Sequence, residues 1–216
     1  METVALISEQ GIDNFSLRAL SLRARVAQKT LYNSFGSKEA LISTAFDYFL
    51  SEQGKRFPLE KMRGVHEIMA QLAQRCEDFI VNRQWSRASN FLYYSFTVDD
   101  RIYATLKDMA MLYFRQYFRV HSSHPDFIAG EPSAYAEMQM SNVAHGTVHD
   151  WVMGRITDEA FPDAVCLGVV SMLASCVRGT LHTELLDLRL TIRDRLAELP
   201  GPDTNALRID AEPVPA

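Results

Sequence analysis

Apolar residues recur every three or four positions along almost the whole chain of 216 residues. This spacing places them on one face of a helix, whereas the strict alternation that marks a strand is hard to find. The pattern therefore predicts an all-α protein. We expect helices over residues 4–10, 17–24, 28–35, 38–49, 65–80, 87–95, 102–117, 133–154 and 162–186, with a short extension towards residue 199.

One short stretch of the sequence carries basic residues without any acid. The chain has a net charge of -5, yet no Asp or Glu occurs between Ser16 and Lys38. The rest of the chain has 17 basic and 27 acidic residues, a net charge of -10. A local basic patch on an acidic protein indicates a confined anionic partner. The basic residues of this stretch are Arg18, Arg23, Arg25, Lys29 and Lys38.

The same stretch predicts two short helices joined by a tight turn. Ser16 can cap the first helix, and a turn at Arg25–Ala27 leads to the second, which ends at Phe35 before Gly36. This order is the helix-turn-helix arrangement. A small core is expected to hold the two helices together, formed by Leu17, Leu20, Ala24, Val26, Leu31 and Phe35.

The second helix of this arrangement exposes hydrogen-bond donors that suit phosphates and base edges. Lys38 adds a further basic group in the first turn of the next helix, where the helix dipole disfavours a cation. A helix N-terminus with a lysine forms a ready phosphate site. The predicted DNA-binding residues are Gln28, Lys29, Thr30, Tyr32, Asn33 and Lys38.

The segment FSLRALSLRARVAQKTLYNSFGSKEAL, residues Phe15–Leu41, resembles the N-terminal DNA-binding domain of the tetracycline-repressor (TetR) family. The resemblance implies a DNA-binding transcriptional regulator, in particular a repressor that a small-molecule ligand releases from its operator. It implies that Lys29, Thr30 and Asn33 face the major groove and that Tyr32 and Lys38 hold phosphates, with Thr30 able to do either. We therefore expect a helix-turn-helix DNA-binding domain over residues 1–50, a ligand-binding and dimerisation domain over 51–199, and a polar tail over 200–216.

Three departures from the family pattern favour an alternative, a helical ligand-binding or interaction protein with weakened DNA binding. Arg25 stands where the family has glycine, so the arginine is strained if the turn needs a positive φ. Ala27 replaces the serine that caps the recognition helix, a loss of about 1 kcal/mol. The chain also begins only ten residues before Gly11, whereas the family has a longer first helix with a basic lead-in.

The two long helices expected near the C-terminus carry stripes that suit close helix packing. Small residues recur from Ala164 to Gly179, and Val143, Thr147 and Trp151 form a stripe on the preceding helix. Either both stripes pack within one subunit, or they form the four-helix homodimer interface that the resemblance implies. The residues expected at that interface are Val143, Thr147, Trp151, Gly168, Ser171 and Ser175.

The opposite face of the helix expected over 133–154 combines polar and aromatic residues, and three interpretations stay open. The two histidines at positions 145 and 149 are hydrogen-bonded in or beside the core, they help to line a ligand pocket, or they chelate a metal, for which no convincing third ligand is found. The pocket interpretation, which the resemblance supports, uses Tyr94, Tyr103, Tyr113, Tyr117, Asn142, His145 and His149.

Other functional classes lack their sequence signatures. No set of nucleophile, base and orienting residue and no phosphate loop appears, so we expect neither an enzyme nor a bound metal or cofactor. Three cysteines without a C-x-x-C pair indicate neither a disulfide framework nor a zinc ribbon. The longest uncharged stretch in the C-terminal half, residues 164–177, is too short to span a membrane. We expect a cytoplasmic protein whose partners are double-stranded operator DNA, a small-molecule effector and a second copy of itself.

Overall fold

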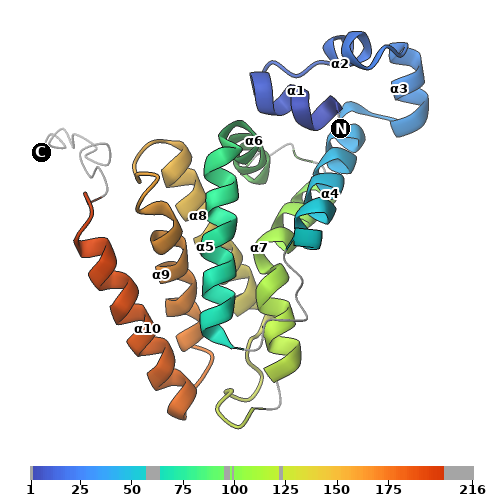
Figure 1. The fold of residues 1–216 in the computed structure, drawn as a ribbon. Coiled ribbons are helices and arrows are strands. Elements are labelled where there is room, and N and C mark those ends of the chain that lie inside the picture. Colours follow the sequence, from blue (N-terminus) through green and yellow to red (C-terminus); the bar gives the residue numbers. More distant parts are fainter. Residues whose placement is uncertain (1, 57–63, 95–97, 99, 122–123, 202–216) are drawn as a thin grey trace, which may run out of the picture.

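A computed structural model describes residues 2–56, 64–94, 98, 100–121 and 124–201 (Figure 1). These residues form helices and no strand, which confirms the predicted all-α fold. The polar tail predicted over 200–216 lies almost wholly outside the described residues. The helices are α1 (Glu2–Gln10), α2 (Leu17–Ala24), α3 (Gln28–Phe35), α4 (Lys38–Arg56), α5 (Val65–Val81), α6 (Arg83–Tyr93), α7 (Asp100–His121), α8 (Ala134–Val152), α9 (Phe161–Ala174) and α10 (Gly179–Ala197).

Helices α1, α2 and α3 lie at one end of the molecule, and α10 lies at the opposite edge (Figure 1). Serine caps fix the starts of two of the N-terminal helices. The Ser16 hydroxyl accepts a hydrogen bond from the Ala19 amide at 3.1 Å, and the Ser37 hydroxyl accepts one from the Ala40 amide at 3.0 Å. These bonds satisfy amides that the first turn of a helix leaves without partners, so the chain begins α2 and α4 at defined positions.

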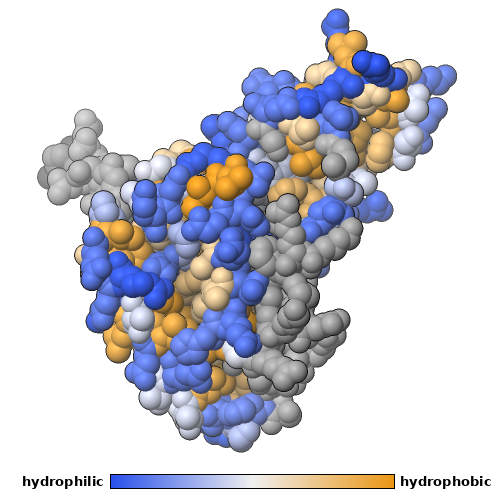
Figure 2. All heavy atoms as spheres, viewed as in Figure 1, coloured by the Kyte–Doolittle hydropathy of each residue, from blue (hydrophilic) through white to orange (hydrophobic). Residues whose placement is uncertain are grey.

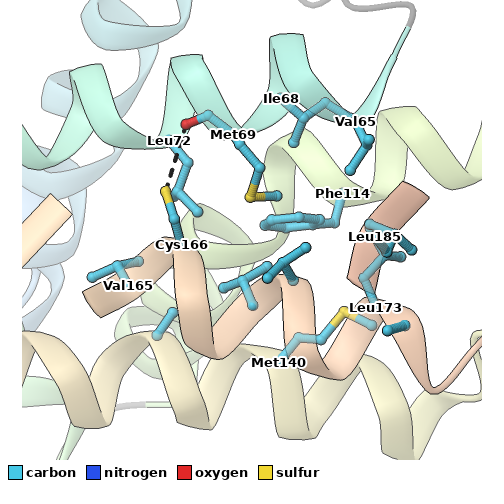
Figure 3. Close-up of a cluster of buried hydrophobic side chains, with 14 of the residues drawn as sticks. Val65, Ile68, Met69, Leu72, Phe114, Met140, Val165, Cys166, Leu173 and Leu185 are labelled. Atoms are coloured by element: carbon cyan, nitrogen blue, oxygen red, sulfur yellow. Dashed lines mark hydrogen bonds between the residues drawn. The ribbon is translucent and has the colours of Figure 1, made fainter. Parts of the chain in front are cut away.

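The buried apolar side chains form two clusters. The first joins the N-terminal helices to α6 and α7, and at its centre the Phe46 ring stacks on Trp85 with centroids 4.1 Å apart. The second cluster lies among α5, α7, α8, α9 and α10, where the Cys166 thiol donates to the Met69 carbonyl at 3.6 Å (Figure 3). The N-terminal helices therefore share one core with α6 and α7. The boundary at residue 50 stays a prediction, since α4 continues to Arg56.

The single helix predicted over 162–186 is wrong, because the chain leaves the helix after Ala174 and begins α10 at Gly179. A neighbouring loop supplies hydrogen bonds that compete with helix continuation. The Ile128 amide donates to the Cys176 carbonyl at 3.0 Å, and the Arg178 amide donates to the Asp126 carbonyl at 2.8 Å. Since hydrophobic periodicity carries no signal for such tertiary bonds, the break could not be predicted from it.

Asp126 also fixes the start of α10. Its carboxylate accepts a hydrogen bond from the Leu181 amide at 2.9 Å. A residue of a distant loop thus satisfies an amide of the first turn, as an N-cap side chain does in other helices. The carboxylate approaches so closely that a Cβ atom on Gly179 would lie 2.6 Å from Asp126 Oδ1. Gly179 also has a φ of 63°, which disfavours other residues. The positive φ and the nearby carboxylate therefore both favour glycine at this corner.

Candidate nucleic-acid interface and ligand cavity

Helix α3 presents nearly all of its side chains to solvent. Leu31 alone of its residues is buried, where it packs with Leu17 and Leu20. Val26 and Phe35 were predicted to share this core, but each is more than a third exposed. All the residues that the sequence predicted for this face, Gln28, Lys29, Thr30, Tyr32 and Asn33, are exposed. The helix thus offers a polar surface that can enter a groove of DNA.

The turn before α3 contains a strained arginine, because the condition stated for Arg25 in the sequence analysis, a positive φ, is met. Arg25 has φ 54° and ψ 41°, the left-handed conformation that glycine adopts readily and that other residues adopt at a cost. Ala27 stands at the N-cap of α3 and makes no side-chain hydrogen bond there. The recognition helix therefore begins with both a strained turn and an unfilled cap.

Replacing Arg25 with glycine should raise the free energy of unfolding. Release of the left-handed strain contributes about 1–2 kcal/mol, while the added freedom of the unfolded chain costs about 0.4–1 kcal/mol. We expect a net gain of up to about 1.6 kcal/mol for Arg25→Gly in urea denaturation. Arg25→Ala keeps the strain and should bring no gain. Equal stability of the two variants would contradict this account of the turn.

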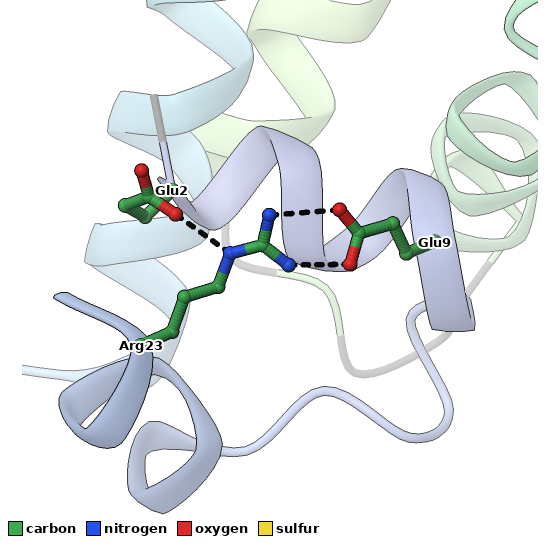
Figure 4. Close-up of polar contacts among 3 residues, drawn as sticks. All are labelled: Glu2, Glu9 and Arg23. Atoms are coloured by element: carbon green, nitrogen blue, oxygen red, sulfur yellow. Dashed lines mark hydrogen bonds and ion pairs between the residues drawn. The ribbon is translucent and has the colours of Figure 1, made fainter.

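Two of the basic residues in the acid-free stretch are held by the protein itself. The Arg23 guanidinium forms a two-pronged contact with Glu9, with Nη2 donating to Oε1 at 2.7 Å, and its Nε donates to Glu2 at 2.6 Å (Figure 4). This hydrogen bond from Arg23 holds the pKa of the Glu9 carboxyl below its ordinary value. Arg23 therefore fastens α2 to α1 and is not free to meet DNA.

Lys38 is the second basic residue with a partner inside the protein. Its ammonium donates to the Phe15 carbonyl at 3.0 Å and lies 5.5 Å from the centre of the Phe15 ring. The contact joins the first turn of α4 to the residue that precedes the cap of α2. Only one of its three N–H donors is used, so its predicted phosphate contact stays a prediction.

The remaining basic residues of the stretch face solvent. Arg18, Arg25 and Lys29 are exposed, and none makes an ion pair with another of the described residues. Arg18 and Arg25 were not among the predicted DNA-binding residues. The exposed cations lie on α2, in the turn after it and on α3, which makes this end of the molecule the candidate nucleic-acid interface.

Residues 2–45 match the family model described as "Bacterial regulatory proteins, tetR family". The chain carries a tetR-family DNA-binding domain. It is therefore a DNA-binding transcriptional regulator, and the tetR-family match covers α1, α2, α3 and the first part of α4. No curated protein and no solved structure matches the chain. No helix within the described ranges is long and apolar enough to cross a membrane.

Five of the regulator's predicted pocket residues belong to a packed network whose centre is formed by Tyr93 and Asn90, two residues that the sequence analysis did not single out. The Tyr93 hydroxyl donates to Asn142 Oδ1 at 2.9 Å, and its ring stacks on His145 with centroids 3.7 Å apart. His149 Nδ1 donates to Asn90 Oδ1 at 2.9 Å. The Tyr103 ring stacks on Tyr93, and the Tyr94 ring meets His149 edge to face. These mutual contacts favour the interpretation in which the histidines are hydrogen-bonded in and beside the core.

A cavity of about 40 Å³ has His145 in its wall. Of the seven predicted pocket residues, His145 is the one that lines it among the described side chains, and those of Tyr113 and Tyr117 lie outside that set. No group of three metal-ligating residues occurs within the part of the chain that the structure describes. The walls come from α5, α7, α8 and α9, and consist of Leu72, Arg75, Cys76, Phe79, Met109, Ala110, Ala144, His145, Val148 and Val165.

His145 is held neutral between the network and the cavity. Burial lowers its pKa from 6.5 to about 4, opposed in part by the hydrogen bond from Nε2 to the Leu106 carbonyl at 3.2 Å. The unfolded chain therefore binds a proton between these pH values when the folded chain does not. Stability is fully present above pH 6.5 and falls as the pH falls towards 4.

His145→Gln should remove this pH dependence, because glutamine can still donate to Leu106 and does not titrate. From pH 7 to pH 4 the wild-type protein should lose roughly 3 kcal/mol more stability than the variant. Urea denaturation at several pH values measures the difference. Parallel stability curves for the two proteins would show that His145 takes up its proton in the folded state.

Of the residues predicted at the dimer interface, some are buried inside the subunit and others are exposed on its surface. Trp151 was predicted at the interface, and this is wrong, because it is fully buried and stacks on Phe161 at 4.4 Å. Gly168 packs within the chain, since a Cβ there would lie 2.5 Å from Val143 Cγ1. Ser171 accepts a hydrogen bond from Arg189 of α10 at 3.0 Å. The stripe of small residues thus serves packing within the subunit at these positions.

Proposed function

We propose that this regulator is a homodimeric repressor that leaves its operator when a small molecule occupies the C-terminal body. The observation that carries the proposal is the position of α6. Its residues Trp85 and Ala88 belong to the core shared with the N-terminal helices. Its residues Asn90 and Tyr93 contact α8, where His145 lines the cavity. A displacement of the cavity wall can therefore reach the DNA-binding domain through one rigid helix.

The size of the cavity favours control by displacement. Its volume of about 40 Å³ holds only a few water molecules. A larger ligand has to move α5, α7 or α8 to enter, so it binds the moved state better than the present one. Such a difference in affinity between two states is what a ligand needs in order to change DNA binding.

A homodimer is the second part of this proposal, since two DNA-binding domains are needed to read successive major grooves about 34–36 Å apart. The support is apolar surface on the side of the body formed by α9 and α10 (Figure 2). Leu186 and Leu190 of α10 are each about 40% exposed. An apolar groove between α8, α9 and α10 is lined by Thr147, Ala164, Leu167 and Leu196. Thr147 was predicted at the interface.

The alternative function is that of a helical ligand-binding or interaction protein with weakened DNA binding. It is favoured by the strained Arg25 and by the missing side-chain cap at Ala27. Both weaken the positioning of α3, and neither removes its exposed donors. The alternative predicts that the protein binds selected DNA no better than random DNA.

A release experiment tests the proposed function. DNA fragments that the wild-type protein retains are labelled, and compounds are screened for loss of DNA binding by fluorescence anisotropy. The proposal predicts that, when a releasing compound saturates the protein, the anisotropy of the labelled DNA falls to the value of unbound DNA. Light scattering should show that the protein is still a dimer. Compounds that bind the body and leave DNA affinity unchanged would contradict control by ligand.

A further inference from the structure

Arg25 is the one residue other than glycine that has a positive φ within the described parts of the chain. Its φ of 54° closes the end of α2, where the Val26 amide donates to the Ser21 carbonyl at 3.0 Å. Helices very commonly end in this way with glycine, which adopts the left-handed conformation without strain. Arginine adds strain at this position, and its side chain is exposed, so packing in the core does not offset that strain. A strained residue of this kind indicates a functional role for its side chain.

The charge of Arg25 has no counter-ion within the described part of the chain. No hydrogen bond or ion pair joins its side chain to another described residue. Two other basic residues of the acid-free stretch differ in this respect, since Arg23 is paired with carboxylates of α1 and Lys38 donates to the Phe15 carbonyl. A guanidinium stays protonated at all physiological pH values, so the full charge of Arg25 and its donors are available to an anion.

Arg25 lies next to the helix that the DNA-binding domain presents to a groove. Only Val26 and Ala27 separate it from Gln28, the first residue of α3. Arg18 stands about two helical turns earlier, so the two arginines follow one another along the same side of α2. A helix in the major groove has a sugar–phosphate backbone on either side, and the residues that flank such a helix contact that backbone. Arginine binds a phosphate through two parallel hydrogen bonds.

We propose that Arg25 is a DNA-backbone contact, whose guanidinium binds a phosphate beside the groove that α3 enters. This role goes beyond the proposed control by ligand, because it concerns the affinity for DNA when no ligand is present. The residue then has two opposite effects: its strain lowers the stability of the turn, and its charge raises the affinity for DNA. A phosphate contact carries no sequence information, so the gain in affinity is the same for every DNA sequence.

Two matched substitutions test the role of the charge. Arg25→Gln and Arg178→Gln each remove one positive charge from an exposed arginine, and Arg178 lies at the N-cap of α10, outside the DNA-binding domain. Fluorescence anisotropy at several salt concentrations measures the affinity for a duplex enriched by the wild-type protein and for a scrambled duplex of the same length. Arg25→Gln should lower the affinity for both duplexes about fivefold near physiological salt, and should reduce the slope of log affinity against log salt by about 0.9.

Arg178→Gln should leave this salt slope unchanged. Equal effects of the two substitutions, or an unchanged affinity and slope in Arg25→Gln, overturn the proposal. A loss of affinity confined to the enriched duplex would mean that Arg25 reads bases, and this result also overturns the phosphate contact. Circular dichroism confirms that each variant is folded.

Arg25→Gly separates the DNA contact from the folding of the turn. This variant should be more stable than the wild-type protein in urea, because the left-handed strain is released. It should nevertheless lose DNA affinity and salt slope as Arg25→Gln does, whereas Arg25→Lys keeps the charge and should keep the slope. A residue that only shaped the turn would not give a gain in stability together with a loss of affinity. An Arg25→Gly protein that binds DNA as tightly as the wild-type protein, or more tightly, overturns the proposal.

These measurements use no effector, so their outcome is independent of the proposed release by ligand. A salt slope that falls in Arg25→Gln and in Arg25→Gly upholds the phosphate contact even if no compound releases the DNA. Release of DNA by a compound, together with an unchanged slope in both variants, upholds the repressor mechanism and overturns the contact.

Discussion

Replacing Lys29 with glutamate is expected to weaken the affinity for operator DNA by about 100-fold at moderate salt. The side chain is exposed on α3 and makes no ion pair with another described residue, so its whole charge is available to DNA. Loss of one good side-chain contact to a base lowers the free energy of DNA binding by about 1–3 kcal/mol. The new carboxylate is in addition repelled by the phosphates. Fluorescence anisotropy with a labelled operator fragment measures the change.

Lys107→Glu is the matched control for this substitution. It makes the same change of charge on α7, far along the chain from the acid-free stretch, and should weaken DNA binding by less than about threefold through net charge alone. Thermal unfolding of both variants checks that they are folded. Equal losses for the two variants would mean that DNA responds to the total charge of the protein and not to α3.

Replacing Trp85 with alanine is expected to lower the free energy of unfolding by about 3–5 kcal/mol. Trp85 is only 2% exposed. It stacks on Phe46 at 4.1 Å and contacts Phe49 at 4.9 Å, so its removal opens a cavity where α4 meets α6. Because this core joins the DNA-binding domain to the body, the variant should also lose release of DNA by ligand. Urea denaturation measures the first effect.

Trp85→Phe is the control for this core position. Phenylalanine keeps an aromatic ring against Phe46 and leaves a smaller void, so the loss of stability should be less than half that of alanine. A loss below about 1 kcal/mol for Trp85→Ala would show that the N-terminal helices and the body do not depend on one core.

The sequence predicted those features that depend on local chemistry. The caps at Ser16 and Ser37 follow from side chains that bind amides two or three residues ahead, and both are present. The positive φ of Arg25 follows from comparison with a glycine position in the family pattern, and it too is present. Absence of acid between Ser16 and Lys38 correctly indicated the basic end, although it did not reveal that Arg23 is already paired.

Features that depend on distant parts of the chain were missed. Trp151 fits an interface stripe by its spacing, but Phe161 covers it from the next helix. The chain breaks after Ala174 because residues 126–128 supply the backbone partners. Arg75 lies on the apolar face of α5, three residues from both Leu72 and Asp78. A charged residue at an apolar position was the one feature of the sequence that pointed to the cavity.

Selection from a pool of random double-stranded DNA tests the central claim most directly. The full chain is used to enrich bound fragments, and the affinity of the enriched sequence is then measured at several salt concentrations. The account predicts paired half-sites whose centres lie about one helical turn, or a whole number of turns, apart. It also predicts an affinity that falls steeply with salt and is lost in Lys29→Glu. No enrichment, or enriched sites that Lys29→Glu binds as well as the wild-type protein does, would contradict the assignment of α3 as the DNA-reading helix.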